Sequence, residues 1–233
     1  MTPHEREAAL GRIAILNGLS PTAIARLAGA CRWREFGPGE LIVSHKDPST
    51  DFHMLATGRV RVSIYSSDGK AVIFTDIKPG EVFGEIAAID KGVRSASVEA
   101  IDESTVASLS AAGFERLLLE EPRVPVATMR LLAAEVRRLS ERVHEFSTLA
   151  VQNRIDAELL RLVGGEAANK TEILLSPAPS LAEIASRVTT HREAVSREVS
   201  RLAALGIVRR EGAGLRIVDL PRLAQLVRDV KSD

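Results

Sequence analysis

The pattern of hydrophobic and polar residues divides the chain into stretches with different periods. Residues 4–29 predict short helices, with Ser20 as an N-cap and Pro21 at the first helical position. From Cys31 onward the hydrophobic residues follow a period of two, in short runs separated by glycine and proline turns. Many short antiparallel strands with frequent turns indicate a jelly-roll or a related barrel. The predicted strands are residues 41–43, 52–57, 60–65, 72–77, 95–100 and 105–109.

A second helical region begins at Ala111. Its hydrophobic residues recur at alternating steps of three and four, a heptad repeat that continues for about twenty residues. A helix lying along its own domain usually has a wider hydrophobic stripe. The pattern therefore favours a parallel two-stranded dimer helix over that alternative. The predicted dimer seam consists of Met129, Leu132, Val136, Leu139, Val143 and Phe146.

The last third of the chain predicts a helix-turn-helix followed by a wing. A helix runs from Val151 to about Val163, and two capping boxes follow, Ser180-x-x-Glu183 and Thr190-x-x-Glu193. The second short helix has an inward hydrophobic stripe and ends at Gly206. Residues 207–210 and 215–218 predict a hairpin. The chain as a whole is predicted to be an α+β protein.

Composition excludes several classes of protein. The 31 basic and 31 acidic residues balance, so any nucleic-acid surface must come from local clustering. The single cysteine, Cys31, cannot form an internal disulfide or hold an iron–sulfur cluster. The N-terminus lacks a secretory signal, and no apolar run is long enough to span a bilayer. We therefore expect a soluble cytoplasmic protein with no membrane partner, metal, iron–sulfur cluster or haem.

Five residues between the fourth and fifth predicted strands could bind a phosphorylated sugar. Gly84 ends a strand, and the apolar run that begins at Ile86 predicts one helical turn with free N–H groups. Arg94 can donate two parallel hydrogen bonds to a phosphate, and Ser95 adds a neutral donor. Glu85 can accept a hydrogen bond from a ribose hydroxyl. A buried salt bridge between Glu85 and Arg94 is the alternative, and spacing alone leaves both interpretations open.

Basic residues cluster in the predicted helix-turn-helix and wing of an otherwise neutral chain. An α-helix fits the major groove of DNA, where arginine pairs with guanine and glutamate accepts from cytosine. A solvated helix face is the alternative, but the caps, the arginine stripe and the wing coincide, which favours double-stranded DNA. The candidate DNA-binding residues are His191, Arg192, Glu193, Ser196, Arg197 and Arg201.

The motif F-G-E-I-A, followed after a short gap by R-S-A-x-V, resembles the phosphate-binding cassette of cyclic-nucleotide-binding domains. The chain contains this cassette, then a long dimer helix, then a winged helix-turn-helix. In this order of elements it resembles the cyclic-AMP receptor protein (CRP/FNR) family. The resemblance implies a regulator and not an enzyme, in which Glu85 holds the ribose 2′-hydroxyl while Arg94 and Ser95 hold the cyclic phosphate. It also implies double-stranded DNA, a second copy of the chain and RNA polymerase as partners.

Arg192-Glu193 followed by Arg197 is similar to the R-E-x-x-x-R set of this family. The resemblance implies that the two arginines read guanines and Glu193 reads a cytosine, in an inverted repeat of the TGTGA type. The chain departs from the family in two places. A Thr-Ser pair that contacts adenine in cyclic-AMP receptors falls here on Leu139-Ser140, so cyclic AMP and cyclic GMP both remain candidates. The Asp that usually caps the helix after the hinge falls on Ala150.

We therefore expect a sensor domain at residues 1–118, a dimerisation helix and hinge at 119–150, and a winged helix-turn-helix at 151–233. Nucleotide is expected to favour one state of the dimer helix and so to align the two recognition helices allosterically. A regulator of the same fold with another effector, or none, is an alternative. A cupin-type metalloenzyme is a remote one, because His45 and His53 are the only histidines of the barrel region and form no close pair.

Overall fold

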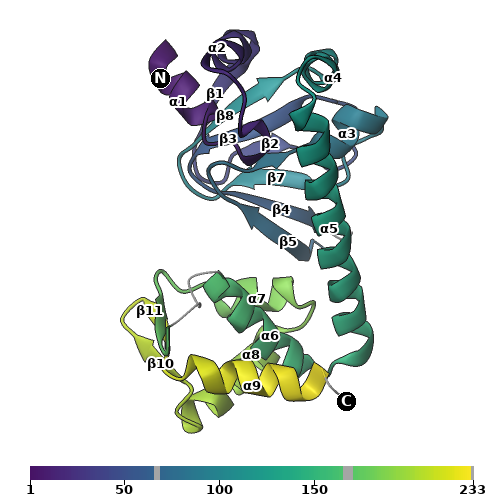
Figure 1. Ribbon diagram of the computed structural model, residues 1–233. Coiled ribbons are helices and arrows are strands. Elements are labelled where there is room, and N and C mark those ends of the chain that lie inside the picture. Colours follow the sequence, from purple (N-terminus) through teal and green to yellow (C-terminus); the bar gives the residue numbers. More distant parts are fainter. Residues whose placement is uncertain (66–68, 165–169, 232–233) are drawn as a thin grey trace. The chain divides into compact units, whose positions relative to one another are not determined.

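The computed structural model describes residues 1–65, 69–164 and 170–231 (Figure 1). The chain forms two compact units, and the division between them falls at residues 136 and 137 of the longest helix. Among the described residues, no helix has both the length and the apolar character needed to cross a bilayer. Each unit has its own hydrophobic core, so each is described separately.

Two four-stranded sheets form the body of the first unit (Figure 1). One sheet has the order β1-β8-β3-β6, with β1 Arg32–Phe36, β8 Ser104–Leu109, β3 Phe52–Thr57 and β6 Val82–Phe83. The other has the order β2-β7-β4-β5, with β2 Leu41–Val43, β7 Ser97–Ala100, β4 Val60–Tyr65 and β5 Ala71–Ile77. Neighbouring strands such as β3 and β8 run antiparallel. The predicted β-roll is confirmed.

Helices cover the first of these sheets. They are α1 Pro3–Leu10, a short 3₁₀ helix Ala14–Leu16, α2 Pro21–Ala30 and α4 Ala111–Glu120. Ser20 caps α2, because its hydroxyl accepts a hydrogen bond from the Ala23 N–H at 3.1 Å, as the sequence predicts. Phe114 of α4 stacks on Phe52 of β3 with ring centroids 4.1 Å apart, and both rings are fully buried. This contact ties α4 to the centre of the sheet.

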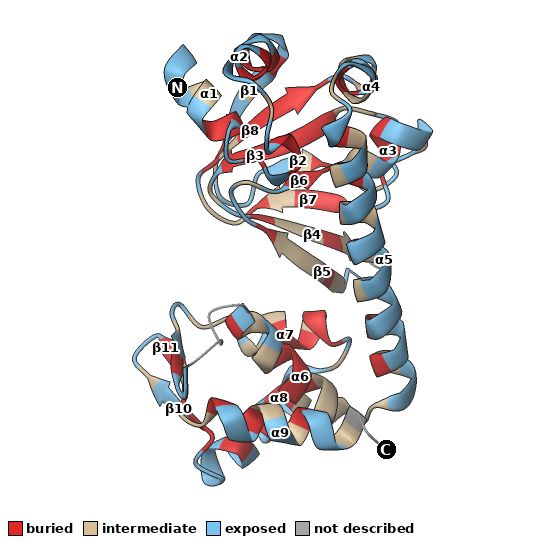
Figure 2. Cartoon of the chain, viewed as in Figure 1, coloured by how far each residue is buried: buried red, intermediate tan, exposed pale blue. Residues whose placement is uncertain are grey.

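Helix α5, Arg123–Thr148, is the longest in the part of the chain that is described. Much of its surface is exposed (Figure 2). Helix α6, Val151–Val163, follows after a break of two residues. Ala150 is the N-cap of α6 and offers no side-chain hydrogen bond, as expected for alanine at this position.

The second unit contains the predicted helix-turn-helix and wing. Its helices after α6 are α7 Leu181–Arg187, α8 Arg192–Ala204 and α9 Leu220–Lys231. A three-stranded sheet has the order β10-β11-β9, with β10 Val208–Glu211, β11 Gly214–Ile217 and β9 Ile173–Leu175. Val195, Val199 and Leu202 of α8 are buried in its core, which confirms the inward stripe. Strand β9 and helix α9 were not among the predicted elements.

The turn between α7 and α8 differs from the prediction. Ser180 caps α7 as expected, since its hydroxyl accepts from the Glu183 N–H at 3.1 Å. The predicted capping box at Thr190 is wrong, because α8 begins one residue later. Its N-cap is His191, which makes no side-chain capping bond. The residue before Thr190, Thr189, has a φ of 52°, in the left-handed region that favours glycine.

Candidate ligand site and nucleic-acid interface

The residues of the predicted phosphate-binding cassette lie where β6 passes into a short helix, α3 Glu85–Asp90. Gly84 has a φ of 79° and precedes this helix. A Cβ atom at Gly84 would lie 2.5 Å from Nη1 of Arg94 and 3.0 Å from the Asp51 carbonyl oxygen. Both the backbone conformation and the close approach of Arg94 therefore require glycine at this position.

The Arg94 side chain is buried, with 3% of its surface exposed, and donates four hydrogen bonds to the protein. Its Nε donates to the Ser49 hydroxyl at 3.1 Å and its Nη1 to the Gly84 carbonyl at 3.2 Å. Its Nη2 donates to the Asp51 carbonyl at 2.8 Å and faces Nε2 of His53 at 3.2 Å. A guanidinium has five N–H groups, so one on Nη1 has no acceptor among the described residues.

None of these four acceptors carries a charge, and no described carboxylate forms a contact ion pair with Arg94. The alternative interpretation of a Glu85–Arg94 salt bridge is therefore not what the structure contains. The Asp51 carboxylate bonds instead to Arg32 at 2.8 Å. Burial lowers the pKa of Arg94, which is the effect of desolvation on a cation that lacks a contact counter-ion. The site thus holds a buried positive charge with no carboxylate in contact, while the carboxylates of Asp51, Asp47 and Glu85 act on it from a longer distance.

Glu85 and Ser95 flank this charge. Glu85 is partly buried, and its carboxylate makes no hydrogen bond to another described side chain. Burial raises the pKa of Glu85 above its usual value, and the nearby Arg94 guanidinium opposes that rise. Ser95 is exposed, as is Ile86 on the outer side of α3. The structure therefore brings an uncommitted carboxylate close enough to Arg94 for their charges to interact.

The hydrophobic residues of the predicted dimer seam lie mostly on the exposed surface of α5. Met129 is 60%, Val136 63%, Leu139 42% and Val143 65% exposed. Leu132 and Phe146 are partly buried, and Phe146 has the guanidinium of Arg142 5.0 Å from its ring centroid. Ser140 is exposed on the same helix. A single chain therefore leaves several large apolar side chains of α5 in water.

The candidate DNA-binding residues on α8 are all exposed: His191, Arg192, Glu193, Ser196, Arg197 and Arg201. Arg192 and Arg197 make no ion pair with any described carboxylate, and the same is true of Arg210 on β10. Arg209 and Arg216 in the wing differ, because both bond to Glu211. These bonds lower the pKa of Glu211 to about 2. The arginines without protein partners are available to an external anion.

The guanidinium of Arg201, although exposed, pairs with carboxylates of the protein. It bonds to Glu198 at 2.6 Å and to Asp156 of α6 at 3.2 Å. Both carboxyl groups are buried. Burial, followed by the neighbouring Glu198, raises the pKa of Asp156 to about 7. Arg201 therefore links α8 to α6, a structural role that the sequence did not indicate.

A second buried ionic cluster joins the end of α5 to α6 and α7, all within the second unit. Arg142 donates to Glu158 at 2.8 Å and also to the carbonyl of Arg187. Arg161 bonds to Glu145 at 2.8 Å and also to Glu158. Arg187 bonds to Glu183 at 3.0 Å. Three arginines and three glutamates therefore balance one another in this cluster.

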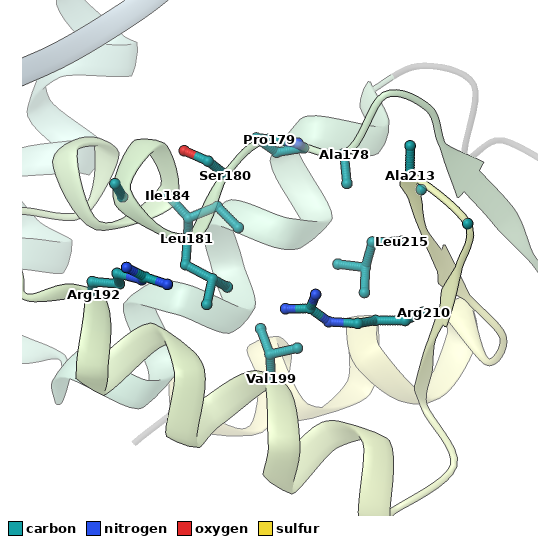
Figure 3. Close-up of a pocket in the computed structure, with 13 residues that line it drawn as sticks. Ala178, Pro179, Ser180, Leu181, Ile184, Arg192, Val199, Arg210, Ala213 and Leu215 are labelled. Carbon is teal, nitrogen blue, oxygen red and sulfur yellow. The ribbon is translucent and has the colours of Figure 1, made fainter.

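A pocket of about 430 Å³ opens between α7, the start of α8 and the β10–β11 turn. Its floor is apolar, formed by Leu181, Val199 and Leu215, and Arg192 and Arg210 extend toward it from opposite sides (Figure 3). Arg210 lies in the wing, where the sequence shows a cluster of basic residues, but its place at this pocket depends on how the hairpin folds back. The pocket thus presents two cations above an apolar surface.

The sequence did not identify His53, Ser49 and Asp51 as partners of Arg94. His53 lies on β3, in a run of hydrophobic residues typical of a buried strand, and its neighbours in space come from other strands. Nothing in the local spacing links residues 49–53 to residue 94. A buried polar residue within an apolar strand was the only available signal.

Two protein-family models match the chain. The cyclic nucleotide-binding domain matches residues 33–121, and the Crp-like helix-turn-helix domain matches residues 153–226. The first model includes the whole cassette, and the second includes α7, α8 and the wing. The chain therefore combines a cyclic-nucleotide-binding unit with a DNA-binding unit.

Full-length relatives have the same combination. The chain is 27% identical over 225 residues to a CRP-like cAMP-activated global transcriptional regulator of Mycobacterium tuberculosis, covering 94% of this chain and 98% of the relative. It is 28% identical over 198 residues to a cyclic AMP receptor protein of Thermus thermophilus, covering 84% and 88%.

Among solved structures, the global regulator CLP of Xanthomonas campestris has the same fold, with a TM-score of 0.74 and 19% identity, over 85% of this chain and 99% of that one. The fold, the two matched domains and the full-length relatives agree. This chain belongs to the cyclic-AMP receptor protein (CRP/FNR) family, whose members are transcription regulators and not enzymes.

Proposed function

We propose that this protein is a homodimeric regulator that binds cyclic AMP or cyclic GMP and thereby gains affinity for a palindromic DNA site of the TGTGA type. It acts in the cytoplasm together with RNA polymerase. The observation that carries the proposal is the buried Arg94 guanidinium without a contacting carboxylate, with the uncommitted Glu85 carboxylate near it. A buried charge without a counter-ion is costly, and a cyclic phosphate would supply the missing negative charge.

Each cassette residue has a distinct part in this proposal. The cyclic phosphate accepts the remaining Nη1–H of Arg94 and the Ser95 hydroxyl, while Glu85 accepts from the ribose 2′-hydroxyl. Gly84 allows Arg94 to approach, and Ile86 shields the sugar. By the resemblance, Ser140 on α5 is the residue assigned to the base. Because Leu139 stands where cyclic-AMP receptors have a second hydroxyl, cyclic GMP is tested in parallel with cyclic AMP.

The exposed stripe on α5 supports a homodimer. Met129, Val136, Leu139 and Val143 would lose their contact with water in a parallel two-stranded coil. Val136→Asp would place two carboxylates opposite each other in that interface and should give monomers in sedimentation. Ala134→Asp adds the same charge to an exposed position outside the seam, and it should leave the dimer intact. A wild-type monomer would exclude the homodimer.

The second unit would bind DNA through α8 and the wing. Arg192, Glu193 and Arg197 read base edges in the major groove, with His191, Ser196 and Arg201 beside them. Arg210 and the apolar pocket suit the sugar–phosphate backbone, which presents both charged oxygens and apolar sugar edges. Two-fold symmetry of the dimer would place the half-sites about one helical turn apart. A footprint on a single, unrepeated site would exclude this arrangement.

Calorimetric titration of cyclic AMP and cyclic GMP, with and without operator DNA, tests the function directly. Arg94→Ala should weaken nucleotide binding by several hundredfold or more, since loss of one partner of a buried charge pair costs about 3–5 kcal/mol. Linkage requires operator DNA to tighten nucleotide binding by the factor with which nucleotide tightens operator binding. Wild-type affinity in Arg94→Ala would refute the assignment of the cassette. Unchanged operator affinity with bound nucleotide would refute the allosteric coupling.

A further inference from the structure

The His53 ring occupies a closed position at the centre of a sheet. It lies on β3 directly opposite Ser108 of β8 on one side and Phe83 of β6 on the other. The ring stacks on Phe83 with centroids 4.8 Å apart, and only 6% of the residue is exposed. A Cβ atom at Gly84 would lie 3.1 Å from Cδ2 of His53. The neighbouring strands therefore fix the plane of the imidazole.

Both ring nitrogens of His53 have partners, and these partners determine the tautomer. Nδ1 lies 2.9 Å from the Ser108 hydroxyl, and Nε2 lies 3.2 Å from Nη2 of Arg94. A guanidinium has donors only, so Nε2 must present its lone pair to Arg94. The single proton of the neutral ring is then on Nδ1, which donates to Ser108.

Three charged groups face His53, and burial together with the Arg94 guanidinium keeps the ring neutral, although the Asp51 carboxylate opposes this effect. Arg94 lies in the loop before β7, Asp51 lies in the loop before β3, and Arg32 lies on β1. Burial first, and Arg94 second, lower the pKa of His53 to about 4. A protonated ring would turn an N–H toward Arg94 and place two like charges in contact.

We propose that His53 is the positioning residue that orients Arg94 toward the cyclic phosphate without neutralising its charge. The proposal rests on the proposed function of the cassette. A carboxylate in place of His53 would orient the guanidinium equally well, but it would form an ion pair and remove the attraction for an anion. A neutral acceptor fixes Nη2 together with the Asp51 carbonyl, while the positive charge and one Nη1–H remain for the ligand.

Two substitutions at His53 separate orientation from packing. His53→Phe keeps a ring against Phe83 but removes the acceptor, and nucleotide affinity should fall by about 10-fold to 100-fold, as for loss of a hydrogen bond to a charged group. His53→Gln can place its amide oxygen near the position of Nε2, and it should recover most of that loss. His45→Phe, at the other histidine of the barrel region, is the matched control and should bind like the wild type.

Calorimetry with cyclic AMP and cyclic GMP, on full-length chains whose Trp33 fluorescence confirms a folded first unit, provides the measurement. Wild-type or tighter binding by His53→Phe would overturn the proposal. Equal losses in folded His53→Phe and His53→Gln would also overturn it, because packing alone would then explain both. If Arg94→Ala binds like the wild type, the proposed function itself fails. If Arg94→Ala loses binding while His53→Phe does not, only the role of His53 fails.

A measurement on the unmodified protein does not depend on the variants folding. Nitrogen-15 spectra of the His53 ring near neutral pH should show a protonated Nδ1 and an unprotonated Nε2. The opposite tautomer, or a charged ring, would overturn the proposal, because Nε2 could then not accept from Arg94.

Discussion

Arg94 in the first unit and Arg142 in the second are both buried arginines, but their partners differ in charge. Arg94 is 3% exposed and bonds to two carbonyls, a hydroxyl and an imidazole. Arg142 is 9% exposed and bonds to the carboxylate of Glu158, in a cluster where three arginines meet three glutamates. Burial alone therefore does not distinguish a binding site from a structural contact.

A structural arginine and a ligand-binding arginine differ in whether contacting carboxylates balance the charge. In the Arg142 cluster the charges balance within the protein, so the cluster can hold α5, α6 and α7 together without any ligand. Around Arg94 the acceptors fix the direction of the guanidinium but are uncharged, so no contacting group balances its charge. The first arrangement is expected to contribute to folding, and the second to binding. Three substitutions test this distinction.

The largest effect is expected for Arg142→Ala. The substitution leaves the buried Glu158 with less compensation and should destabilise the second unit by about 3–5 kcal/mol. Trp33, the single tryptophan, lies in the first unit, so its fluorescence reports on that unit alone. In urea, the circular-dichroism transition of the helices should shift while the Trp33 transition stays in place.

Arg137→Ala, at an exposed position of the same helix, is the control for Arg142→Ala. It should change the unfolding free energy by less than about 0.5 kcal/mol. A shift of the Trp33 transition in Arg142→Ala would contradict the assignment of the cluster to the second unit. An unchanged helix transition would show that the buried ion pairs do not stabilise the protein.

A smaller effect is expected from the buried carboxyl pair of Asp156 and Glu198. The pKa of Asp156 is raised to about 7 in the folded chain, so the folded state binds a proton more readily than the unfolded state. The associated stability is fully present below about pH 4 and is lost as the pH rises through 7. The stability of Asp156→Asn relative to the wild type should therefore increase between pH 5 and pH 8, by on the order of 2 kcal/mol.

Urea unfolding of both proteins between pH 5 and pH 8 measures the difference. Only the difference is informative, because other carboxyl groups titrate in both chains. A difference that is constant across this range would show that Asp156 does not titrate there. A wild type whose stability relative to Asp156→Asn increases toward pH 8 would show that Arg201 compensates the charged form.

The smallest effect is expected for an exposed pair with similar geometry. Arg59 bonds to Asp102 through two nitrogens, at 2.6 and 3.2 Å, on the surface of the first unit. Both side chains are nearly half exposed, so water and salt screen the interaction. Arg59→Gln should change the unfolding free energy of the first unit, followed by Trp33 fluorescence, by less than about 1 kcal/mol. A loss comparable with that of Arg142→Ala would mean that geometry, and not burial, sets the value of an ion pair.

Much of the fold could be predicted from local sequence. Strands β2, β3 and β4 begin and end at the predicted residues, because period-two hydrophobic runs are bounded by turn residues on both sides. Strand β6 was given no range because Val82–Phe83 is too short to show a period, although Gly84 was expected at the end of a strand. Helix α9 has a readable stripe at Leu220, Leu223 and Val227, which the prediction did not use.

The candidate site could be predicted only in part. The motif locates Glu85, Arg94 and Ser95, because it is continuous in sequence. Three of the four acceptors of Arg94 are more than forty residues away in the chain, and they reach it only because β3 lies between β8 and β6. The predicted two-bond contact between Arg94 and a phosphate assumed a free guanidinium. The structure instead has four of its N–H groups bonded to protein, which no local pattern indicates.

The left-handed backbone of Thr189, in the turn before α8, affects how many substitutions the second unit can tolerate. Thr189 holds a left-handed conformation that costs a β-branched residue about 1–2 kcal/mol. This strain lowers the free energy of unfolding of the second unit, and glycine at this position would be less strained. An average substitution costs about 1 kcal/mol. With threonine in this turn, the second unit tolerates roughly one fewer destabilising substitution before it fails to fold. Its surface is therefore less free to change toward new DNA sites.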